Sequence, residues 1–387
     1  MASHPPSRAF AAFCSLLSRL AVFTASIAIF SAFFVGSLFA FEHLYAKRVN
    51  INPDYDLRER HVVLRERKPG FFQRVGVEYA DGRQGMTDFS VDEDGFVRPS
   101  RVHGKPDLSL VFIGGSTTET MFVAEDKRFP FLVGRKLEQA TGLKINSYNG
   151  GVAGNHSMNS NVAVMAKAIP LRPRFLIYMD AVNDLTALTN AGSYWATGYS
   201  RSLVAAEDRV ALLEYLARWT RNEALPYTIA IANWAWHNRI RPILGERSRP
   251  VDEFANVRGT QFFEPERFLS EFGHSLDTLI AITRAWDIEP ILMTQFNQIH
   301  PDKPTNEFTL PVAWDEFAET YRRFNQLIRK KAEDRGVRLV DLDTLVPKDS
   351  RHLYDSVHLT VEGSELVADI VTRALIDALS QPSRAVR

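Results

Sequence analysis

Ser116 is the first residue along this chain whose type and position suggest chemistry. It follows an apolar run, residues 108–113, and then Gly114 and Gly115. The run predicts a buried strand, and glycine permits a sharp turn, so we expect Ser116 at the carboxyl end of that strand. Open α/β sheets build their sites at this edge, where a serine can act as a nucleophile. The same pattern is also typical of a turn whose serine hydroxyl caps the next helix.

A base with a carboxylate partner is predicted near the C-terminus, at Asp355 and His358. Because the two residues are three positions apart on one loop, the carboxylate can fix the imidazole tautomer. The other ring nitrogen is then left to take a proton from a serine hydroxyl. An Asp-x-x-His pair alone is more often structural than catalytic. His352 is the nearest competing histidine, and we expect it to lack a carboxylate at this spacing.

Two polar turns follow the second and third predicted strands. Residues 149–155 form a glycine-rich turn that contains Gly154, and residues 180–184 place Asn183 just beyond the third strand. A backbone N–H and an asparagine amide are donors that can stabilise the negative charge of a tetrahedral intermediate in ester cleavage. Asparagine and glycine are also ordinary turn residues, so each turn alone needs no catalytic explanation.

These four stretches together resemble the SGNH (GDSL-like) hydrolase superfamily, over about residues 108–379 and apart from an insertion. The family's blocks are a Gly-Asp-Ser serine, a glycine, an asparagine in Gly-x-Asn-Asp, and Asp-x-x-His. The resemblance implies Ser116 as the nucleophile, His358 as the general base and Asp355 as its orienting partner. It also implies an oxyanion hole formed by the N–H groups of Ser116 and Gly154 and by the Asn183 side chain.

The sequence departs from the family pattern at two positions. Gly115 replaces the aspartate of the first block, and Ala181 replaces the glycine of the third. Neither residue belongs to the triad, and the small Ala181 side chain leaves Asn183 able to point inward. The long insertion after Asn183 affects what the resemblance implies about the substrate but not about the chemistry.

Strands alternate with helices from residue 108 onward, which predicts right-handed crossovers and a parallel sheet covered on both faces. We therefore expect an α/β fold with three layers, α/β/α, and the resemblance implies an SGNH hydrolase-like, flavodoxin-like form of it. Residues 107–380 are predicted as this domain. Its helical insertion, at about 191–261, holds Trp195, Trp219, Trp234 and Trp236. These rings either cap the site or, as we favour, pack the insertion onto the body.

The N-terminal region is predicted to anchor the chain. Residues 20–41 carry no charge, and a helix of that length measures roughly 33 Å, enough to cross a bilayer core. The run is long for a cleaved signal peptide, and the pattern expected at a cleavage site is poor. A lipoprotein signal does not fit either, because Cys14 comes before the apolar run instead of at its end. A buried soluble helix is rarely apolar all round. We expect a tail at 1–19, one transmembrane helix at 20–42, and a stalk with a small β-rich lead-in at 43–106.

Composition limits the classes of partner. The formal net charge is zero, which argues against nucleic acid. The scattered histidines and the single cysteine predict no metal site, and the sequence Gly114-Gly115 lacks the frame of a dinucleotide motif, so no cofactor is expected.

The resemblance implies a serine esterase or acyl hydrolase acting on ester groups of a small molecule, an envelope glycan or a lipid. Its triad would form an acyl-enzyme. Two alternatives stay open: an O-acyltransferase that passes the acyl group to a polysaccharide, and a non-catalytic glycan- or lipid-binding module on the same fold. By analogy with anchored family members, the protein is expected in a bacterial membrane with its domain on the periplasmic side. The count of flanking arginines and lysines mildly favours the opposite orientation.

Overall fold

The computed structural model describes residues 19–34, 36–37, 60–62, 64–195, 201, 203–206, 263–305, 307–308 and 310–380. The chain divides into two units, Met1–Glu59 and Arg60–Arg387. In the first unit, residues 19–34 and 36–37 are helical with exposed side chains. Among the described residues, no helix combines the length and the apolarity that a membrane crossing needs. The span expected at 20–42 therefore stays a prediction, and most of the insertion, with Trp219, Trp234 and Trp236, lies outside the described residues.

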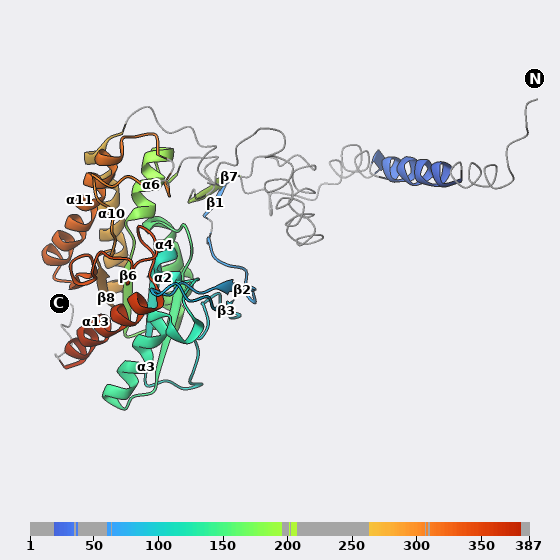
Figure 1. The fold of residues 1–387 in the computed structure, drawn as a ribbon. Helices are drawn as coiled ribbons and strands as arrows, with labels where there is room; N and C mark the ends of the chain where they lie inside the picture. The colour runs from blue at the N-terminus through green and yellow to red at the C-terminus, as the bar shows by residue number, and fades with distance from the viewer. Residues whose placement is uncertain are drawn as a thin grey trace, which may run out of the picture. The chain divides into compact units, whose positions relative to one another are not determined.

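A parallel sheet of five strands forms the centre of the second unit (Figure 1). Its order is β5-β4-β6-β8-β9, and all four pairings are parallel. In chain order this is the sequence 2-1-3-4-5 of flavodoxin-like sheets, so the predicted α/β fold with a parallel sheet is confirmed. The strands are β4 (Leu108–Gly114), β5 (Ile145–Gly151), β6 (Phe175–Met179), β8 (Glu289–Met293) and β9 (Arg338–Val340).

Both faces of the sheet are buried, which explains why its strands read as nearly continuous apolar runs. Side chains alternate along a strand, and Leu110 and Phe112 of β4 join one hydrophobic cluster while Val111 and Ile113 join another. Strands β6 and β8 divide their side chains between the same two clusters in the same way. The sheet therefore separates two cores, and a helical layer closes each of them.

Helices cover the two faces in separate groups. The core that contains Leu110 and Phe112 is closed by α3 (Phe129–Thr141), α12 (Leu342–Leu345) and α13 (Val361–Ser380). The opposite core is closed by α4 (Ser157–Ala163), α6 (Val182–Ala191), α10 (Pro265–Ala285) and α11 (Trp314–Asp334). Figure 1 shows α10 and α11 running side by side and α13 beside α3. The expected three layers are thus present.

The helical pattern of the sequence from Ser157 to Ile169 predicts one helix, but the structure there is not a continuous α-helix. After α4 the chain widens into a π-helical turn, η4 (Val164–Ala168), and then closes in the short α5 (Ile169–Leu171). Pro170 has no N–H and its ring crowds the carbonyl four residues earlier, and a wider turn relieves that clash. Helical periodicity in the sequence does not separate a π turn from an α turn, so the prediction missed it.

The β-rich lead-in contains a hairpin. Strand β2 (Phe72–Gly76) pairs antiparallel with β3 (Met86–Ser90). The dipeptide Asp94-Gly95 is typical of a tight turn, and a turn is present there. The hairpin is tied to the main sheet by neighbouring residues, because the Val97 N–H donates to the Asn149 carbonyl at 2.8 Å. A second small pairing joins β1 (Arg60–Val62) to β7 (Val204–Ala206). The lead-in therefore packs directly against the hydrolase-like body.

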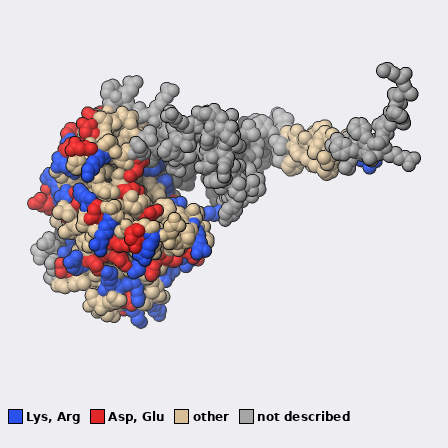
Figure 2. All heavy atoms as spheres, viewed as in Figure 1, with Lys and Arg blue, Asp and Glu red and all other residues tan. Residues whose placement is uncertain are grey.

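Charges of both signs are interspersed over the face of the molecule seen in Figure 2. Some of these charges pair between α10 and α11, as in Arg323–Glu266 and Lys331–Asp277, both at 2.6 Å. An ion pair that water reaches, such as Arg323–Glu266, contributes little stability, about 0–1 kcal/mol. The packing of α10 on α11 therefore rests mainly on their buried faces, where Phe272 stacks on Phe324 at 4.7 Å between ring centroids.

Candidate active site

Ser116, His358 and Asp355 meet at the carboxyl end of β4. Ser116 begins the short helix α2 (Ser116–Glu119) directly after the strand, and the other two residues lie on the loop before α13. The Nε2 atom of His358 lies 2.8 Å from Ser116 Oγ, and its Nδ1 lies 2.7 Å from Asp355 Oδ2. An unbroken chain of hydrogen bonds therefore runs from the serine hydroxyl through the imidazole to the carboxylate.

The Asp355 carboxylate is held in its ionised form. Burial alone raises its pKa, but hydrogen bonds from the His358 ring and from two backbone N–H groups outweigh burial, so the pKa is lowered. Those N–H groups belong to Val357 and His358 and donate to Oδ1 at 2.9 and 2.7 Å. With one oxygen fixed by the backbone, the other points at the imidazole and sets its tautomer.

The expectation that His352 lacks a carboxylate partner is wrong. Asp349 stands three positions earlier, and its Oδ1 lies 2.7 Å from His352 Nδ1. The loop therefore contains two Asp-x-x-His pairs of the same spacing, and spacing alone does not distinguish them. The structure does, because the imidazole of His358 is the one that reaches Ser116.

The loop that carries Gly154 is held by Arg65 of the lead-in. Arg65 Nη1 donates to the Ala153 carbonyl at 2.6 Å and to Asn155 Oδ1 at 2.9 Å. The Asn155 amide returns a hydrogen bond to the Arg65 carbonyl at 3.2 Å. Gly154 itself has a φ of +80°, a conformation that favours glycine. Sequence reasoning found Gly154 but missed Arg65, because the two positions are far apart in the chain.

Arg201 covers the same loop from the other side. A Cβ atom added to Gly154 would lie 2.7 Å from the Arg201 guanidinium carbon, so a larger residue there requires the Arg201 side chain to move. The position of Arg201 is fixed by His156, whose Nε2–H donates to the Arg201 carbonyl at 2.9 Å. Arg201 Nη1 in turn lies 3.4 Å from Asn183 Oδ1.

Two hydrogen-bond partners fix the orientation of the Asn183 amide, one at its oxygen and one at its nitrogen. Its Oδ1 faces the Arg201 guanidinium, while its Nδ2 donates to the Asn155 carbonyl at 2.8 Å. An amide nitrogen carries two hydrogens, so one is left to face the space beside Gly115 and Ser116. Within the described part of the chain, the N–H groups of Ser116 and Gly154 also donate to no acceptor. Ser116, Gly154 and Asn183 line one cavity, and their role as oxyanion donors stays a prediction.

Gly115 is the residue that lets Asn183 approach the serine. A Cβ atom at Gly115 would lie 2.4 Å from Asn183 Nδ2, and its φ of −85° suits any residue. Gly115→Ala should therefore displace the Asn183 amide without straining the backbone. We expect kcat for a 4-nitrophenyl ester to fall about tenfold or more, since small misplacements in a site are costly. Gly104→Ala is the control, because nothing lies within 4 Å of that added Cβ; equal activity of the two variants would contradict this reading.

Gln295 links the serine turn to the Asn183 turn, and the sequence analysis missed it. It follows β8 and is 1% exposed. Its Nε2 donates to Thr117 Oγ1 at 3.0 Å, and its Oε1 accepts the Val182 N–H at 2.8 Å. Thr117 is the neighbour of Ser116, and Val182 is the neighbour of Asn183. The signal in the sequence was a polar run, residues 294–295, directly after an apolar strand.

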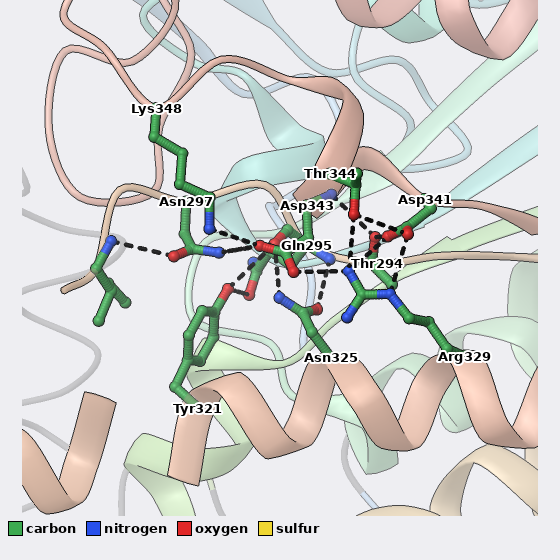
Figure 3. A network of polar contacts seen from close by, with 11 residues as sticks. Thr294, Gln295, Asn297, Tyr321, Asn325, Arg329, Asp341, Asp343, Thr344 and Lys348 are labelled. Atoms are coloured by element: carbon green, nitrogen blue, oxygen red, sulfur yellow. Dashed lines mark hydrogen bonds and ion pairs between the residues drawn. The ribbon is translucent and has the colours of Figure 1, made fainter. Parts of the chain in front are cut away.

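A wider polar network holds Gln295 in place (Figure 3). The Tyr321 hydroxyl donates to Gln295 Oε1 at 3.0 Å, and the Asn325 side chain bonds both backbone groups of Gln295. Further along α11, Arg329 bridges Asp341 and Asp343, at 2.7 Å to each carboxylate. The strand end is therefore bound to α11 and to the segment after β9.

Replacing Gln295 by methionine, which has a similar shape without the amide, should loosen both turns. We expect kcat to fall about tenfold with little change in KM. The reason is that Gln295 bonds the neighbours of Ser116 and Asn183, and so positions these two residues, but does not contact the substrate. Thermal stability should also fall, since buried partners lose their hydrogen bonds. Gln326→Met, on the exposed face of α11, is the control. A kcat equal to that of the control would contradict the positioning role.

Two buried carboxylates stand beside the Asn183 turn. Asp184 accepts the Ser157 N–H at 3.1 Å and the Tyr194 hydroxyl at 2.7 Å, which fixes the start of α4. Burial raises the pKa of Asp184 to about 6. Burial, reinforced by the charge of Asp184, raises the pKa of Asp180 well above its usual value. Ser160 donates to Asp180 at 2.6 Å. These two carboxylates therefore bind the residues after β6 to the start of α4.

Buried His156 makes stability depend on pH. Burial lowers the pKa of His156 to about 3, so the folded protein keeps it neutral while the unfolded chain takes up a proton below about pH 6.5. The unfolded state then binds more protons, and unfolding free energy falls as the pH falls between those values. His156 alone should remove about 2 kcal/mol between pH 6.5 and pH 5.

The variant His156→Gln, which keeps a side-chain N–H donor, should lose less stability over the same range. Denaturant unfolding of both proteins at pH 7 and pH 5 measures this difference. The comparison is made between the two proteins because Asp184, whose pKa is raised to about 6, has the opposite effect on stability between about pH 4 and pH 6. The raised pKa of Asp180 acts in the same direction as that of Asp184. If the unfolding free energies of parent and variant changed equally with pH, His156 would not be the source of the pH dependence.

Two cavities open beside Ser116 and His358. The narrow one has a volume of about 70 Å³ and apolar walls that include Val123 and Leu359. The wide one has a volume of about 530 Å³ and is lined by Asn183, Gly154, Arg65 and Arg201, among other residues. Within the part of the chain that the structure describes, no cluster of three or more His, Cys, Asp or Glu side chains is placed to hold a metal ion.

The chain was compared with known families, curated proteins and solved structures. The GDSL-like Lipase/Acylhydrolase family matches residues 112–366. Among solved structures, a catalytic mutant of Axe2, an acetylxylan esterase from Geobacillus stearothermophilus, is 17% identical, covers 70% of this chain and 94% of its own, and has a TM-score of 0.40. LAE5, an alpha/beta hydrolase enzyme from the metagenome of Lake Arreo in Spain, is 18% identical, with 69% and 94% covered and a TM-score of 0.39. No curated protein matches the sequence.

The family match extends over more than half of the chain and contains Ser116, Gly154, Asn183, Asp355 and His358. The chain therefore belongs to the GDSL-like lipase/acylhydrolase family, within the SGNH hydrolase superfamily. It is a serine hydrolase that acts on ester bonds, as the resemblance in the sequence implied.

Proposed function

We propose that this protein is a serine esterase that works through a Ser116–His358–Asp355 triad and a covalent acyl-enzyme. The observation that carries the proposal is the hydrogen-bond chain from Ser116 Oγ to His358 Nε2 at 2.8 Å and from His358 Nδ1 to Asp355 at 2.7 Å. An imidazole held in this way can accept the serine proton as the oxygen attacks. Asp355 stays ionised and stabilises the imidazolium that forms.

The reaction follows in two balanced halves. Ser116 Oγ attacks the ester carbonyl, its proton passes to His358 Nε2, and His358 then gives this proton to the leaving alcohol oxygen. Water attacks the acyl-serine next and loses its proton to His358, which returns it to Ser116 as the carboxylic acid departs. In both halves the N–H groups of Ser116 and Gly154 and the Asn183 amide stabilise the oxyanion.

The proposed substrate is an ester carried by a glycan or lipid of the cell envelope. The polar wide cavity supports an alcohol part with many hydroxyl groups, because arginine, glutamate, asparagine and threonine side chains line it. We further propose that residues 20–42 anchor the chain in a membrane with the hydrolase-like domain outside the cytoplasm. The uncharged run 20–41 and the exposed apolar side chains of the helix at 19–34 support this anchor.

Product analysis tests hydrolysis against transfer. The 387-residue chain is given 4-nitrophenyl acetate with and without a soluble oligosaccharide, and nitrophenol, acetate and acetylated sugar are quantified. We expect acetate and nitrophenol in equal amounts in both reactions. Acetylated oligosaccharide in place of acetate would instead establish an acyltransferase. Release of neither product, from a folded protein, would favour a non-catalytic binding module.

Fractionation tests the anchor. We expect the full chain in the membrane pellet and a variant that begins at residue 43 in the supernatant. External protease should then digest the hydrolase-like domain in intact spheroplasts. Recovery of both proteins in the same fraction would contradict the anchor, and protection of the domain would reverse the proposed orientation.

A further inference from the structure

The two cavities beside Ser116 share one wall. Phe122 lines both of them, together with Ser116, Ala153 and His358. Its ring is 40% exposed and meets Tyr354 edge-on, with ring centroids 6.4 Å apart and planes at 88°. Phe122 therefore lies between the narrow cavity and the wide cavity. It is next to Ser116, where the acyl part and the alcohol part of a bound ester extend in different directions.

The narrow cavity is closed by side chains that have little room to move. Val123 is 1% exposed and Leu359 is 2% exposed. Tyr354 stacks on the His358 ring at 5.7 Å with planes 12° apart, so it cannot swing away without disturbing the base. The turn after α2 is fixed at the other wall, because the Val123 N–H donates to the Thr120 carbonyl at 3.1 Å.

The wide cavity has the opposite character. Its volume is about 530 Å³ against about 70 Å³ for the narrow cavity. Charged and polar side chains line it, including Glu66, Glu307 and Thr186. It also contains the oxyanion donors at Gly154 and Asn183. Such a surface offers hydrogen bonds to hydroxyl groups, whereas the narrow cavity offers mainly carbon.

We propose that the narrow cavity holds the acyl group, that the wide cavity holds the alcohol part, and that Phe122 limits the acyl group to a short chain. The inference rests on the proposed esterase function and deepens it. The narrow cavity, with about 70 Å³ against about 530 Å³ for the wide cavity, is closed by Val123, Leu359 and Tyr354, so it accepts only a short acyl chain. The substrate class is thus a short-chain acyl ester, acetyl or propionyl, of a hydroxyl-rich alcohol.

A pair of isomeric esters tests which cavity holds the acyl group and which holds the alcohol part. Octyl acetate and ethyl octanoate have the same atoms, but one places eight carbons on the alcohol side and the other places them on the acyl side. The 387-residue chain is assayed with each at equal concentration, and released acid is titrated. We expect octyl acetate to be cleaved at least about tenfold faster, since one badly placed methylene already costs about that much.

Substitution of Phe122 then tests the partition. Phe122→Ala joins the two cavities, and we expect the preference for octyl acetate to fall about tenfold or more, with Phe122→Leu between the parent and the alanine variant. The control is Phe72→Ala, an exposed phenylalanine of β2 that lines neither cavity and should keep the preference of the parent. Because Phe122 is 40% exposed, we expect the Phe122→Ala variant to fold.

Each outcome has a distinct meaning. A parent enzyme that cleaves ethyl octanoate as fast as octyl acetate, or a Phe122→Ala variant no different from Phe72→Ala, would overturn this inference and leave the esterase intact. Cleavage of neither isomer, together with no hydrolysis of 4-nitrophenyl acetate, would overturn the proposed function itself.

Discussion

Ser116→Ala should reduce ester hydrolysis by about 10⁴-fold or more, and His358→Ala should cost about as much. The hydroxyl of Ser116 is the only group of that residue that can form the acyl-enzyme, and without His358 the hydroxyl keeps its proton at neutral pH. Because the two residues act as one unit, the double variant should be no slower than either single one. The measurement is kcat for 4-nitrophenyl acetate, with folding checked by circular dichroism.

His352→Ala is the matched control for this prediction. It lies on the same loop and has its own carboxylate partner, Asp349, at 2.7 Å, but the imidazole that reaches the serine belongs to His358. We expect His352→Ala to keep the activity of the parent. A loss as large as that of His358→Ala would mean that the choice between the two Asp-x-x-His pairs is wrong.

Asn183→Ala should lower kcat by about 100- to 1000-fold, the usual cost of one oxyanion donor. Its amide lies against Gly115 and is oriented by the Asn155 carbonyl and by Arg201, so its second hydrogen is aimed before the substrate arrives. KM should change much less than kcat, because the donor acts most strongly on the charge that develops in the transition state.

Asn190→Ala provides the control for Asn183. Asn190 is on the same helix, α6, but is buried, and among the described residues it bonds only the Thr186 carbonyl, at 2.9 Å. It should lose some stability and keep its kcat. If Asn183→Ala and Asn190→Ala retained the same kcat, Asn183 would not be an oxyanion donor.

Much of the fold was predictable because its signals are local. Apolar runs mark the strands and amphipathic patterns mark the helices between them, and this alternation predicts a parallel sheet. The serine, glycine, asparagine and Asp-x-x-His stretches all follow strand ends, so a parallel sheet brings them to one edge. The π-helical turn η4 was missed because its cause, the clash at Pro170, changes the width of a turn but not the hydrophobic period.

The supporting residues were not predictable in the same way. Arg65 and Asn155 bond across 90 positions, and Gln295 reaches Thr117 across 178. Such pairs depend on tertiary packing, and arginine or glutamine in a polar loop has no periodic signature. Two carboxylate–histidine pairs of equal spacing, at 349–352 and 355–358, are likewise separated only by the direction in which each ring points.

Labelling with a fluorophosphonate probe tests the central claim most directly. The 387-residue chain, Ser116→Ala and His358→Ala are treated in parallel, and the adduct is measured by intact mass and located by peptide mapping. An activated triad predicts one adduct on Ser116 of the parent and none on either variant. A folded parent without an adduct, or an adduct on a residue other than Ser116, would contradict it.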